Sequence, residues 1–165
     1  MKAKFLFTIL MLFILVGCTS QQSDQLTQQQ KEQIKSEVKA VSDSITARWV
    51  GLDAEGALQY YSPDLVHVYD SLRLDFQAYK KGWIDLNNSI TTIKVTPIRE
   101  DYIVLTKDLV ISTWVGKDEY NMKSGDKIIG DPLTYTLVFK NIAGQWKVLY
   151  SHASVIPVTQ KAEKK

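Results

Sequence analysis

The sequence predicts one α+β domain in which helices come first and an antiparallel sheet follows. Three observations lead to this fold class. Apolar residues recur with helical spacing in the first half of the chain, β-branched and aromatic residues dominate after Ile90, and the last two predicted strands carry apolar side chains on both faces. The length of 165 residues suits a single domain, and a composition of 45% hydrophobic and 23% charged residues excludes a largely disordered chain.

The first predicted helix begins at Lys31 and ends at Gly51, a residue type that commonly follows the last turn of a helix. A stripe of apolar residues along one face of this helix predicts that it packs against the rest of the domain. The stripe consists of Ile34, Val38, Val41, Ile45 and Trp49.

The second predicted helix is short. Asp53 can cap its first turn, the helix covers Ala54 to Tyr60, and the pair Pro63-Asp64 ends it in a turn. A short strand is expected from Leu65 to Asp70. Asp75 can cap a third helix, which ends at Asn87-Asn88. The apolar face of this third helix consists of Phe76, Tyr79, Trp83 and Leu86.

Everything after Ile90 is predicted to be strand or turn. Pro97 marks a bulge or a sheet edge, since proline cannot donate to a strand ladder. Residues 116–127 are rich in polar side chains and are predicted to be a loop. The expected strands and turns, in order, are a strand over 91–104, a turn at 106–108, strands over 109–115 and up to Lys140, a turn at 141–144, and a last strand from Gln145 to Ile156.

The first 17 residues have the pattern of a signal peptide. Lys2 and Lys4 precede an almost unbroken apolar run from Phe5 to Val16, which is shorter than the roughly 20 residues that a membrane-spanning helix needs. The run ends at Leu15-Val16-Gly17-Cys18, which resembles the lipobox of bacterial lipoproteins. This resemblance implies that residues 1–17 are a lipoprotein signal peptide and that Cys18 is the lipidation site.

The domain organisation follows from these observations. Residues 18–30, which include the lipidated Cys18, are rich in glutamine and are expected to be a flexible tether. Residues 31–157 are expected to form the folded domain, and residues 158–165 a charged, disordered tail. Since Asp24 is the only acidic residue in the tether, we expect the protein on the periplasmic side of the outer membrane of a bacterial envelope, held by acyl chains.

Composition disfavours several function classes. Without Lys2 and Lys4 the basic and acidic residues are equal in number, and a neutral body does not suit nucleic-acid binding. One cysteine excludes an intrachain disulfide, and only His67 and His152 are available as histidine ligands. Neither a metal site nor a cofactor is expected, because the chain also has no glycine-rich phosphate loop.

Two parts of the predicted domain have a recognisable pattern: Trp49 to Leu58 with Tyr61-Ser62-Pro63-Asp64, and Tyr135 to Lys140 with Gly144 to Val148 and His152-Ala153-Ser154. These segments resemble the nuclear transport factor 2-like superfamily, particularly its SnoaL-like bacterial branch. The resemblance implies a cone-shaped, curved antiparallel sheet wrapped around three N-terminal helices, also described as a cystatin-like α+β barrel, with a central pocket. It also implies a dimer formed through the sheet. Members of this superfamily include enzymes and non-catalytic binding domains, so the fold alone does not decide the function.

The ketosteroid isomerases of this superfamily offer a specific comparison. Asp70 is the closest match to their general base, although the family spacing falls on Tyr69. Their oxyanion hole needs a tyrosine where Ile45 stands and an acid where Thr136 stands. Because an enolate needs such donors, the sequence disfavours isomerase chemistry.

Other candidate site residues are aromatic or titratable. Acid–base candidates are Asp70, His152, Tyr61 and Tyr135, although His152 also suits an interface, since it shares strand parity with Trp146. Trp146 itself is expected to be a packing residue. The residues expected to line a small apolar pocket are Trp49, Tyr60, Trp83, Trp114, Tyr69 and His67. For His67 the structural role, in which its ring satisfies a backbone group, is the favoured alternative.

These observations lead to two hypotheses about function. The first is a lipid-anchored cone domain that binds a small apolar molecule or a partner protein without catalysis. The alternative is a lyase, isomerase or hydrolase of SnoaL-like type that acts in the central pocket. A homodimer is expected in either case, because both faces of the last strands carry apolar side chains.

Overall fold

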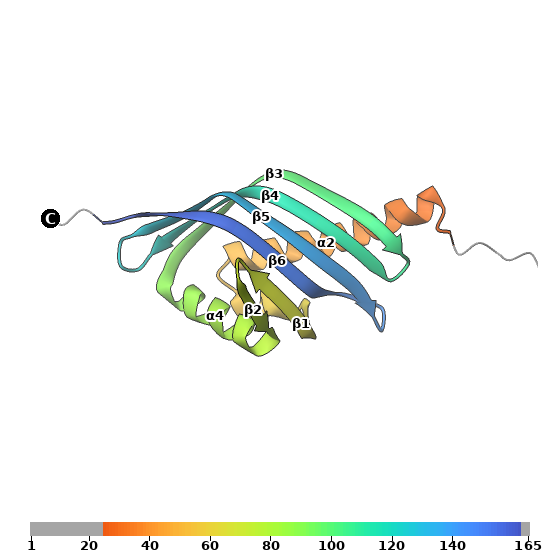
Figure 1. Ribbon diagram of the computed structural model, residues 1–165, viewed down its shortest axis with the longest axis horizontal. Coiled ribbons are helices and arrows are strands. Elements are labelled where there is room, and N and C mark those ends of the chain that lie inside the picture. The colour runs from red at the N-terminus through yellow and green to blue at the C-terminus, as the bar shows by residue number, and fades with distance from the viewer. Residues whose placement is uncertain (1–24, 163–165) are drawn as a thin grey trace, which may run out of the picture.

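The computed structural model describes residues 25–162, and within this range three helices pack against a six-stranded curved sheet (Figure 1). This arrangement confirms the predicted α+β class. The order of strands in the sheet is β2-β1-β6-β5-β4-β3. The elements are α2 (Gln28–Val50), α3 (Ala54–Leu58), β1 (Tyr61–Tyr69), β2 (Leu72–Asp75), α4 (Phe76–Ser89), β3 (Ile90–Thr106), β4 (Leu109–Met122), β5 (Lys127–Ile142) and β6 (Gln145–Gln160).

The pairing of the strands is antiparallel with one exception. Strands β3 to β6 form a continuous antiparallel series, and β2 pairs with β1 in the same way. Strand β1 instead runs parallel to β6, with Tyr69 opposite Ala153. The predicted antiparallel sheet is therefore present with one parallel pair at its side, because β1 and β6 are joined through the whole of the intervening chain and not through a hairpin.

Helix α2 begins earlier than the sequence predicted. Thr27 caps it in a capping box: its hydroxyl accepts from the backbone N–H of Gln30, and the Gln30 side chain accepts from the backbone N–H of Thr27. Leu26 packs against the core. The boundary expected at residue 31 is therefore several residues too late, because the cap lies within the glutamine-rich stretch. Cys18 lies outside the described residues.

The aspartate caps of the other helices are confirmed. Asp53 accepts a hydrogen bond from the backbone N–H of Gly56 at 2.9 Å, and Asp75 accepts one from Ala78 at 2.9 Å. Helix α4 continues through the asparagine pair to Ser89. No helix within residues 25–162 is long and apolar enough to cross a membrane.

Three predictions about strand boundaries are wrong. The expected turn at Pro63-Asp64 is an irregularity within β1, and the expected loop over 116–127 is mostly strand, with β4 reaching Met122 and β5 starting at Lys127. Strand β6 extends to Gln160, which pairs with Lys127, so the tail does not begin at residue 158. Lys117 and Glu119 lie on one face of β4 and alternate with the residues of its other face. The many polar residues of this segment therefore belong to a strand, although their composition is typical of a loop.

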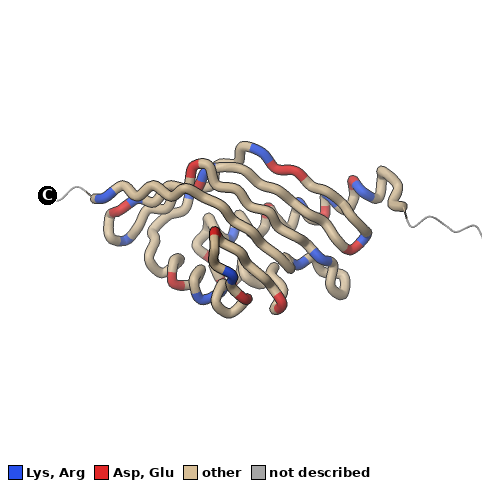
Figure 2. Tube along the Cα trace, in the orientation of Figure 1, with Lys and Arg blue, Asp and Glu red and all other residues tan. Residues whose placement is uncertain are grey.

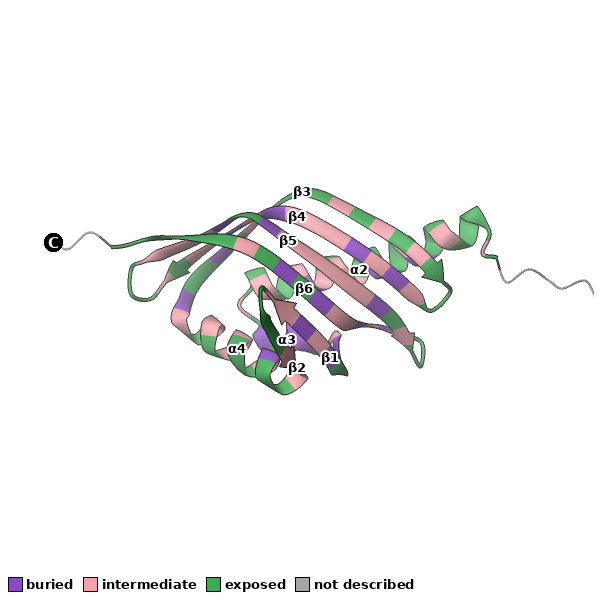
Figure 3. Ribbon diagram, in the orientation of Figure 1, coloured by how far each residue is buried: buried purple, intermediate pink, exposed green. Residues whose placement is uncertain are grey.

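The main core joins α2, α3 and α4 to the sheet, and Figure 3 shows buried segments in the middle of β4, β5 and β6. Trp146 is 7% exposed and belongs to this core, so its prediction as a packing residue is confirmed. Its indole Nε1–H donates to Glu37 on α2 at 3.1 Å. The buried residues of this core are Ile34, Val38, Ile45, Leu58, Tyr61, Leu65, Tyr79, Val110, Phe139, Trp146 and Val148.

A bulge in β6 changes which side chains face the core. The register between β5 and β6 shifts between Val138 and Phe139, so that Phe139 pairs with Val148 but Val138 pairs with Tyr150. Beyond the bulge, Ser151 and Ala153 are buried, whereas His152 is exposed. The expectation that His152 lies on the same face as Trp146 is therefore wrong.

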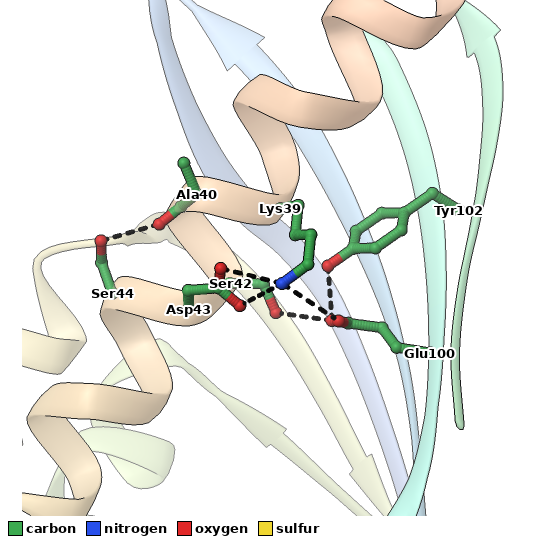
Figure 4. Close-up of polar contacts among 7 residues, drawn as sticks. All are labelled: Lys39, Ala40, Ser42, Asp43, Ser44, Glu100 and Tyr102. Carbon is green, nitrogen blue, oxygen red and sulfur yellow. Dashed lines mark hydrogen bonds and ion pairs between the residues drawn. The ribbon is translucent and has the colours of Figure 1, made fainter. Parts of the chain in front are cut away.

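A polar cluster connects α2 to β3 (Figure 4). Ser42 on α2 donates to the carboxylate of Glu100 at 3.0 Å, and the hydroxyl of Tyr102 donates to the same oxygen. The ammonium group of Lys39 lies 2.6 Å from Asp43 and 3.9 Å from Glu100. Burial and the hydrogen bond to Glu100 raise the pKa of Tyr102. These contacts hold α2 at a defined position across the concave face of the sheet.

Candidate functional site

Two cavities lie between the helices and the concave face of the sheet. The narrow chamber has a volume of about 80 Å³ and the wide chamber about 420 Å³, and both are lined by Tyr79, Trp83, Tyr120 and Tyr135. The narrow chamber is further lined by Ser42, Ile45, Thr46, Trp49, Tyr61, Ile93, Val95, Ser112, Trp114, Asp118 and Leu137. The wide chamber is further lined by His67, Tyr69, Leu72, Leu74, Gly82, Leu86, Ile128, Gly130, Leu133, Ala153, Val155 and Pro157.

Asp118 is a buried carboxylate in the wall of the narrow chamber. It is 6% exposed, and its Oδ2 accepts a hydrogen bond from the hydroxyl of Tyr120 at 3.0 Å. Its Oδ1 is buried and has no hydrogen-bond partner among the described residues. Burial raises the pKa of Asp118 to about 6, and the hydrogen bond from Tyr120 offsets part of this effect. Asp118 therefore changes its charge close to neutral pH.

Asp118 is not among the site residues predicted from the sequence, because residues 116–127 were expected to form a loop. A usable signal was present: Trp114, Asp118 and Tyr120 are separated by even numbers of residues, which places them on one face of a strand. The side chains of Lys117 and Glu119 lie on the other face. Gly116 lies on the same face of β4 as Trp114 and Asp118, and a Cβ atom at this position would collide with the ring of Trp114. Glycine therefore allows the indole to fold back over its own strand.

Aromatic rings form most of the walls shared by the two chambers. Trp49 from α2 and Trp83 from α4 are stacked, with ring centroids 4.3 Å apart. Tyr79 lies 6.2 Å from Trp83 and 5.3 Å from Tyr61. Burial raises the pKa of Tyr61 and of Tyr79, so both phenols keep their protons at neutral pH.

The opposite wall of the narrow chamber comes from the sheet. The ring of Trp114 on β4 lies 6.1 Å from that of Tyr135 on β5, measured between centroids, and these two residues pair across the strands. Burial raises the pKa of Tyr135 and of Tyr120 as well. The tyrosines around Asp118 are therefore neutral hydrogen-bonding groups.

His67 lies in the wall of the wide chamber. Its ring is 4.6 Å from that of Tyr79, and it is 6% exposed. Burial, with a smaller contribution from His152, lowers the pKa of His67 to about 4. Its Nδ1 has no partner in the described part of the chain. At neutral pH His67 is therefore an uncharged ring that can donate or accept one hydrogen bond.

The structure separates the residues that the sequence analysis had grouped together. Among the acid–base candidates, Tyr61 and Tyr135 line the narrow chamber, but Asp70 and His152 do not line either chamber. Asp70 is exposed in the turn between β1 and β2 with a φ of 50°, and His152 is exposed on the convex face of the sheet. Contrary to the prediction, neither Asp70 nor His152 faces a chamber, and the exposure of His152 follows from the bulge in β6.

The aromatic candidates show a similar division. Trp49, Trp83, Trp114, Tyr69 and His67 all line a chamber. Tyr60 does not: its ring faces the guanidinium group of Arg48, 6.0 Å away, at the end of α2. In residues 25–162 no three His, Cys, Asp or Glu side chains are placed to hold a metal ion together.

The expected fold is confirmed by comparison with solved structures. A protein from Novosphingobium aromaticivorans, named as a candidate scytalone dehydratase, superposes with a TM-score of 0.73 at 10% identity, over 84% of this chain and 94% of its own. A nuclear transport factor 2-like protein of unknown function from Pseudomonas putida gives 0.62 at 19% identity, over 72% and 84%. A candidate calcium/calmodulin-dependent protein kinase II association domain from Xanthomonas campestris gives 0.62 at 20%, over 73% and 86%.

These likenesses concern the fold alone. No protein-family model matches the chain, and no curated protein matches it. The matched structures carry names as different as a dehydratase and a kinase association domain. The fold therefore leaves the function to be argued from the chambers.

Proposed function

We propose that this nuclear transport factor 2-like cone binds a small, mostly apolar molecule without chemically changing it. The observation that carries the proposal is the wide chamber, whose volume of about 420 Å³ is bounded mainly by aliphatic and aromatic side chains. Small-molecule sites typically occupy roughly 300–1,000 Å³ and combine apolar walls with a few polar groups. Here the histidine and the carboxylate line different chambers, His67 the wide one and Asp118 the narrow one.

An enzymatic role is the second candidate, and Asp118 is the observation that favours it. A buried carboxylate with a raised pKa is suited to act as a general base, and one of the similar folds is named for a dehydratase. Binding without catalysis is preferred because, among the described residues, no second carboxylate, histidine or lysine lines the narrow chamber beside Asp118, so no acid–base pair is assembled there. The two roles can be distinguished by incubating a copurifying molecule with the protein and measuring its mass by mass spectrometry before and after. A binding protein leaves the mass unchanged, whereas an enzyme converts the molecule into a product of different mass or different fragmentation.

Blocking the wide chamber tests the proposed function. Gly82 on α4 lines this chamber, and a Cβ atom at this position would meet nothing within 4 Å. A larger side chain at Gly82 can therefore enter the open space without collision, on the helix face that also carries Tyr79 and Leu86. We expect Gly82→Phe to reduce the binding of N-phenyl-1-naphthylamine, an uncharged fluorescent probe, by roughly tenfold or more.

The matched control is Gly82→Ala. It adds only the Cβ atom and removes a helix-interior glycine, so we expect it to keep probe binding and to increase stability by about 0.5–1 kcal/mol. The proposed function is wrong if the wild-type protein does not bind the probe. It is equally wrong if the phenylalanine variant binds the probe as tightly as the alanine variant.

We further propose that Cys18 anchors the protein to the bacterial envelope, on the periplasmic side of the outer membrane. The support is the sequence pattern that ends in Leu15-Val16-Gly17-Cys18. Radiolabelled palmitate should be incorporated into the wild-type protein and not into Cys18→Ala, because the acyl chains are carried by the modified cysteine. Equal labelling of the two proteins contradicts the anchor.

A homodimer through the convex face of the sheet is also proposed. Several large apolar side chains are exposed on this face, and residues 148–160 of β6 contain no Lys, Arg, Asp or Glu (Figure 2). Soluble monomers seldom expose an apolar surface larger than a few hundred Å². Light scattering at high micromolar concentration should give twice the monomer mass, and a monomer contradicts the proposal. The exposed apolar residues of this face include Ile103, Ile156 and Val158.

A further inference from the structure

The free oxygen of Asp118 indicates what kind of molecule the chambers bind. A carboxylate can accept about four hydrogen bonds, yet Asp118 receives one from Tyr120, and its Oδ1 receives none from any described residue. An unpaired buried acceptor costs free energy in the folded protein. A ligand that brings a donor to this oxygen removes that cost when it binds. The inference rests on the proposed binding function and adds the class of the ligand.

The negative charge of Asp118 is not neutralised by any side chain that lines the chambers. Neither lining contains a lysine or an arginine. The adjacent Lys117 and Glu119 lie on the opposite face of β4, where Lys127 pairs with Glu119 and Lys117 lies 3.5 Å from Asp131. Lys117 and Lys127 are therefore already engaged with other carboxylates. A positive charge in the narrow chamber has to come from the ligand.

The aromatic walls favour the same kind of ligand. Trp114 and Tyr135 lie together beside Asp118 in the lining of the narrow chamber, and the stacked pair of Trp49 and Trp83 closes another side. The face of an aromatic ring attracts a cation, most strongly when water is excluded. An ammonium group is thus stabilised by the carboxylate through a charge-assisted hydrogen bond and by the surrounding rings.

We propose that the ligand is an organic amine whose protonated nitrogen donates to Oδ1 of Asp118, with Trp114 and Tyr135 beside it. Its apolar body extends past the shared aromatic residues into the wide chamber. The chambers are therefore expected to select molecules that carry a positive charge at one end and an apolar group at the other. A neutral alcohol of the same shape lacks the charge, and an apolar acid is repelled by the carboxylate.

Three compounds of one shape test this inference: 2-phenylethylamine, 2-phenylethanol and 3-phenylpropanoate. Isothermal titration calorimetry on the full protein at pH 8 should show the amine binding roughly tenfold to a hundredfold more tightly than the alcohol, and no binding of the acid. In Asp118→Asn the amine should lose this advantage, while the alcohol should bind as before.

Glu119→Gln is the matched control. It removes the same charge one residue along the chain, on the opposite face of β4, and should leave the binding of all three compounds unchanged. If amine binding falls equally in both variants, the effect is a general one of charge and the inference is wrong.

The pH dependence of the wild-type protein provides a second measurement that does not need a variant. Other titratable groups face Asp118 from several elements: Tyr120 on β4, Tyr135 on β5, Tyr61 and Tyr69 on β1, and Tyr79 on α4. All five tyrosines have raised pKa values, and His67 has a pKa of about 4, so between pH 5 and pH 8 the charge that changes in the chambers is that of Asp118. The amine keeps its proton throughout, since amine pKa values resemble that of lysine.

We therefore expect amine affinity to fall about tenfold from pH 8 to pH 5 as Asp118 is protonated, with the alcohol unaffected. Equal affinities for amine and alcohol at pH 8 overturn the inference, and so does a pH-independent amine affinity. If N-phenyl-1-naphthylamine binds in the wide chamber but the amine has no advantage, the proposed function stands and only the ligand class is wrong. If neither the uncharged probe nor the amine binds, both are wrong.

Discussion

Asp118→Asn is expected to increase the stability of the protein at pH 8 and to leave it almost unchanged below pH 4. The pKa of Asp118 is raised from 3.8 to about 6 in the folded protein, so folding disfavours the ionised form. Below pH 3.8 the carboxyl group is protonated in both the folded and the unfolded protein, so it does not lower the free energy of unfolding. As the pH rises from 3.8 through about 6, the unfolded chain ionises more readily than the folded one, and the free energy of unfolding falls. A shift of this size corresponds to about 3 kcal/mol once the group is fully ionised.

The asparagine amide can still accept the hydrogen bond from Tyr120 but carries no charge. The difference in unfolding free energy between variant and wild type should therefore grow from pH 4 to pH 7 and then level off. Urea denaturation followed by circular dichroism measures this difference. His67 has the opposite effect, because its lowered pKa costs stability as the pH falls from 6.5 towards about 4. That contribution is common to both proteins and cancels in the comparison.

Asp70→Asn is the control for this experiment, since Asp70 is an exposed carboxylate in a turn, at a φ of 50° that asparagine tolerates. It should behave like the wild type at both ends of the pH range. A loss of stability in Asp118→Asn at pH 8 would show that the carboxylate supports the fold. The expected gain would instead show that the chain keeps a charged group in the chamber at a cost to stability, as functional sites often do.

Trp146→Ala is expected to destabilise the protein by about 3–5 kcal/mol, a large part of the roughly 5–15 kcal/mol that stabilises a typical domain. The indole is 7% exposed and packs in the core beneath α2. Its removal leaves a cavity between helix and sheet and deprives Glu37 of a hydrogen bond. Thermal denaturation should show a sharply lower melting temperature, or the variant should fail to accumulate in soluble form.

Two further variants separate the contributions of Trp146. Trp146→Phe keeps most of the apolar contact but removes the indole N–H, so it should cost less than the alanine variant. His152→Ala, on the exposed convex face, should change the melting temperature little. A melting temperature for Trp146→Ala close to that of the wild type would contradict the position of Trp146 in the core.

The features that could be predicted from the sequence depend on residues close together in the chain. The caps at Asp53 and Asp75 involve a side chain and a backbone N–H three residues apart, so both helix starts are visible in the sequence. The apolar stripe of α2 repeats within each turn of a helix. The turn predicted over residues 141–144 is likewise local, and the structure has it at Ala143-Gly144, both with positive φ values.

The features that could not be predicted depend on pairing between distant strands. His152 was assigned to the wrong face because the bulge opposite Val138 and Phe139 arises only when β5 and β6 are aligned. The parallel pairing of β1 with β6 joins segments at opposite ends of the domain, for which the sequence has no local signal.

The composition of the candidate site shows the same division. Aromatic residues that line the chambers, such as Trp49, Trp83 and Trp114, could be predicted from the sequence, because large apolar side chains on amphipathic elements face inward. Only the tertiary structure showed that Asp118 joins them. In the sequence, a carboxylate between Lys117 and Glu119 indicates an exposed loop. In the structure this segment is part of β4, which pairs with β3 on one side and β5 on the other. The pairing turns one face of the strand towards the helices, and the resulting burial raises the pKa of Asp118 and leaves its Oδ1 without a partner.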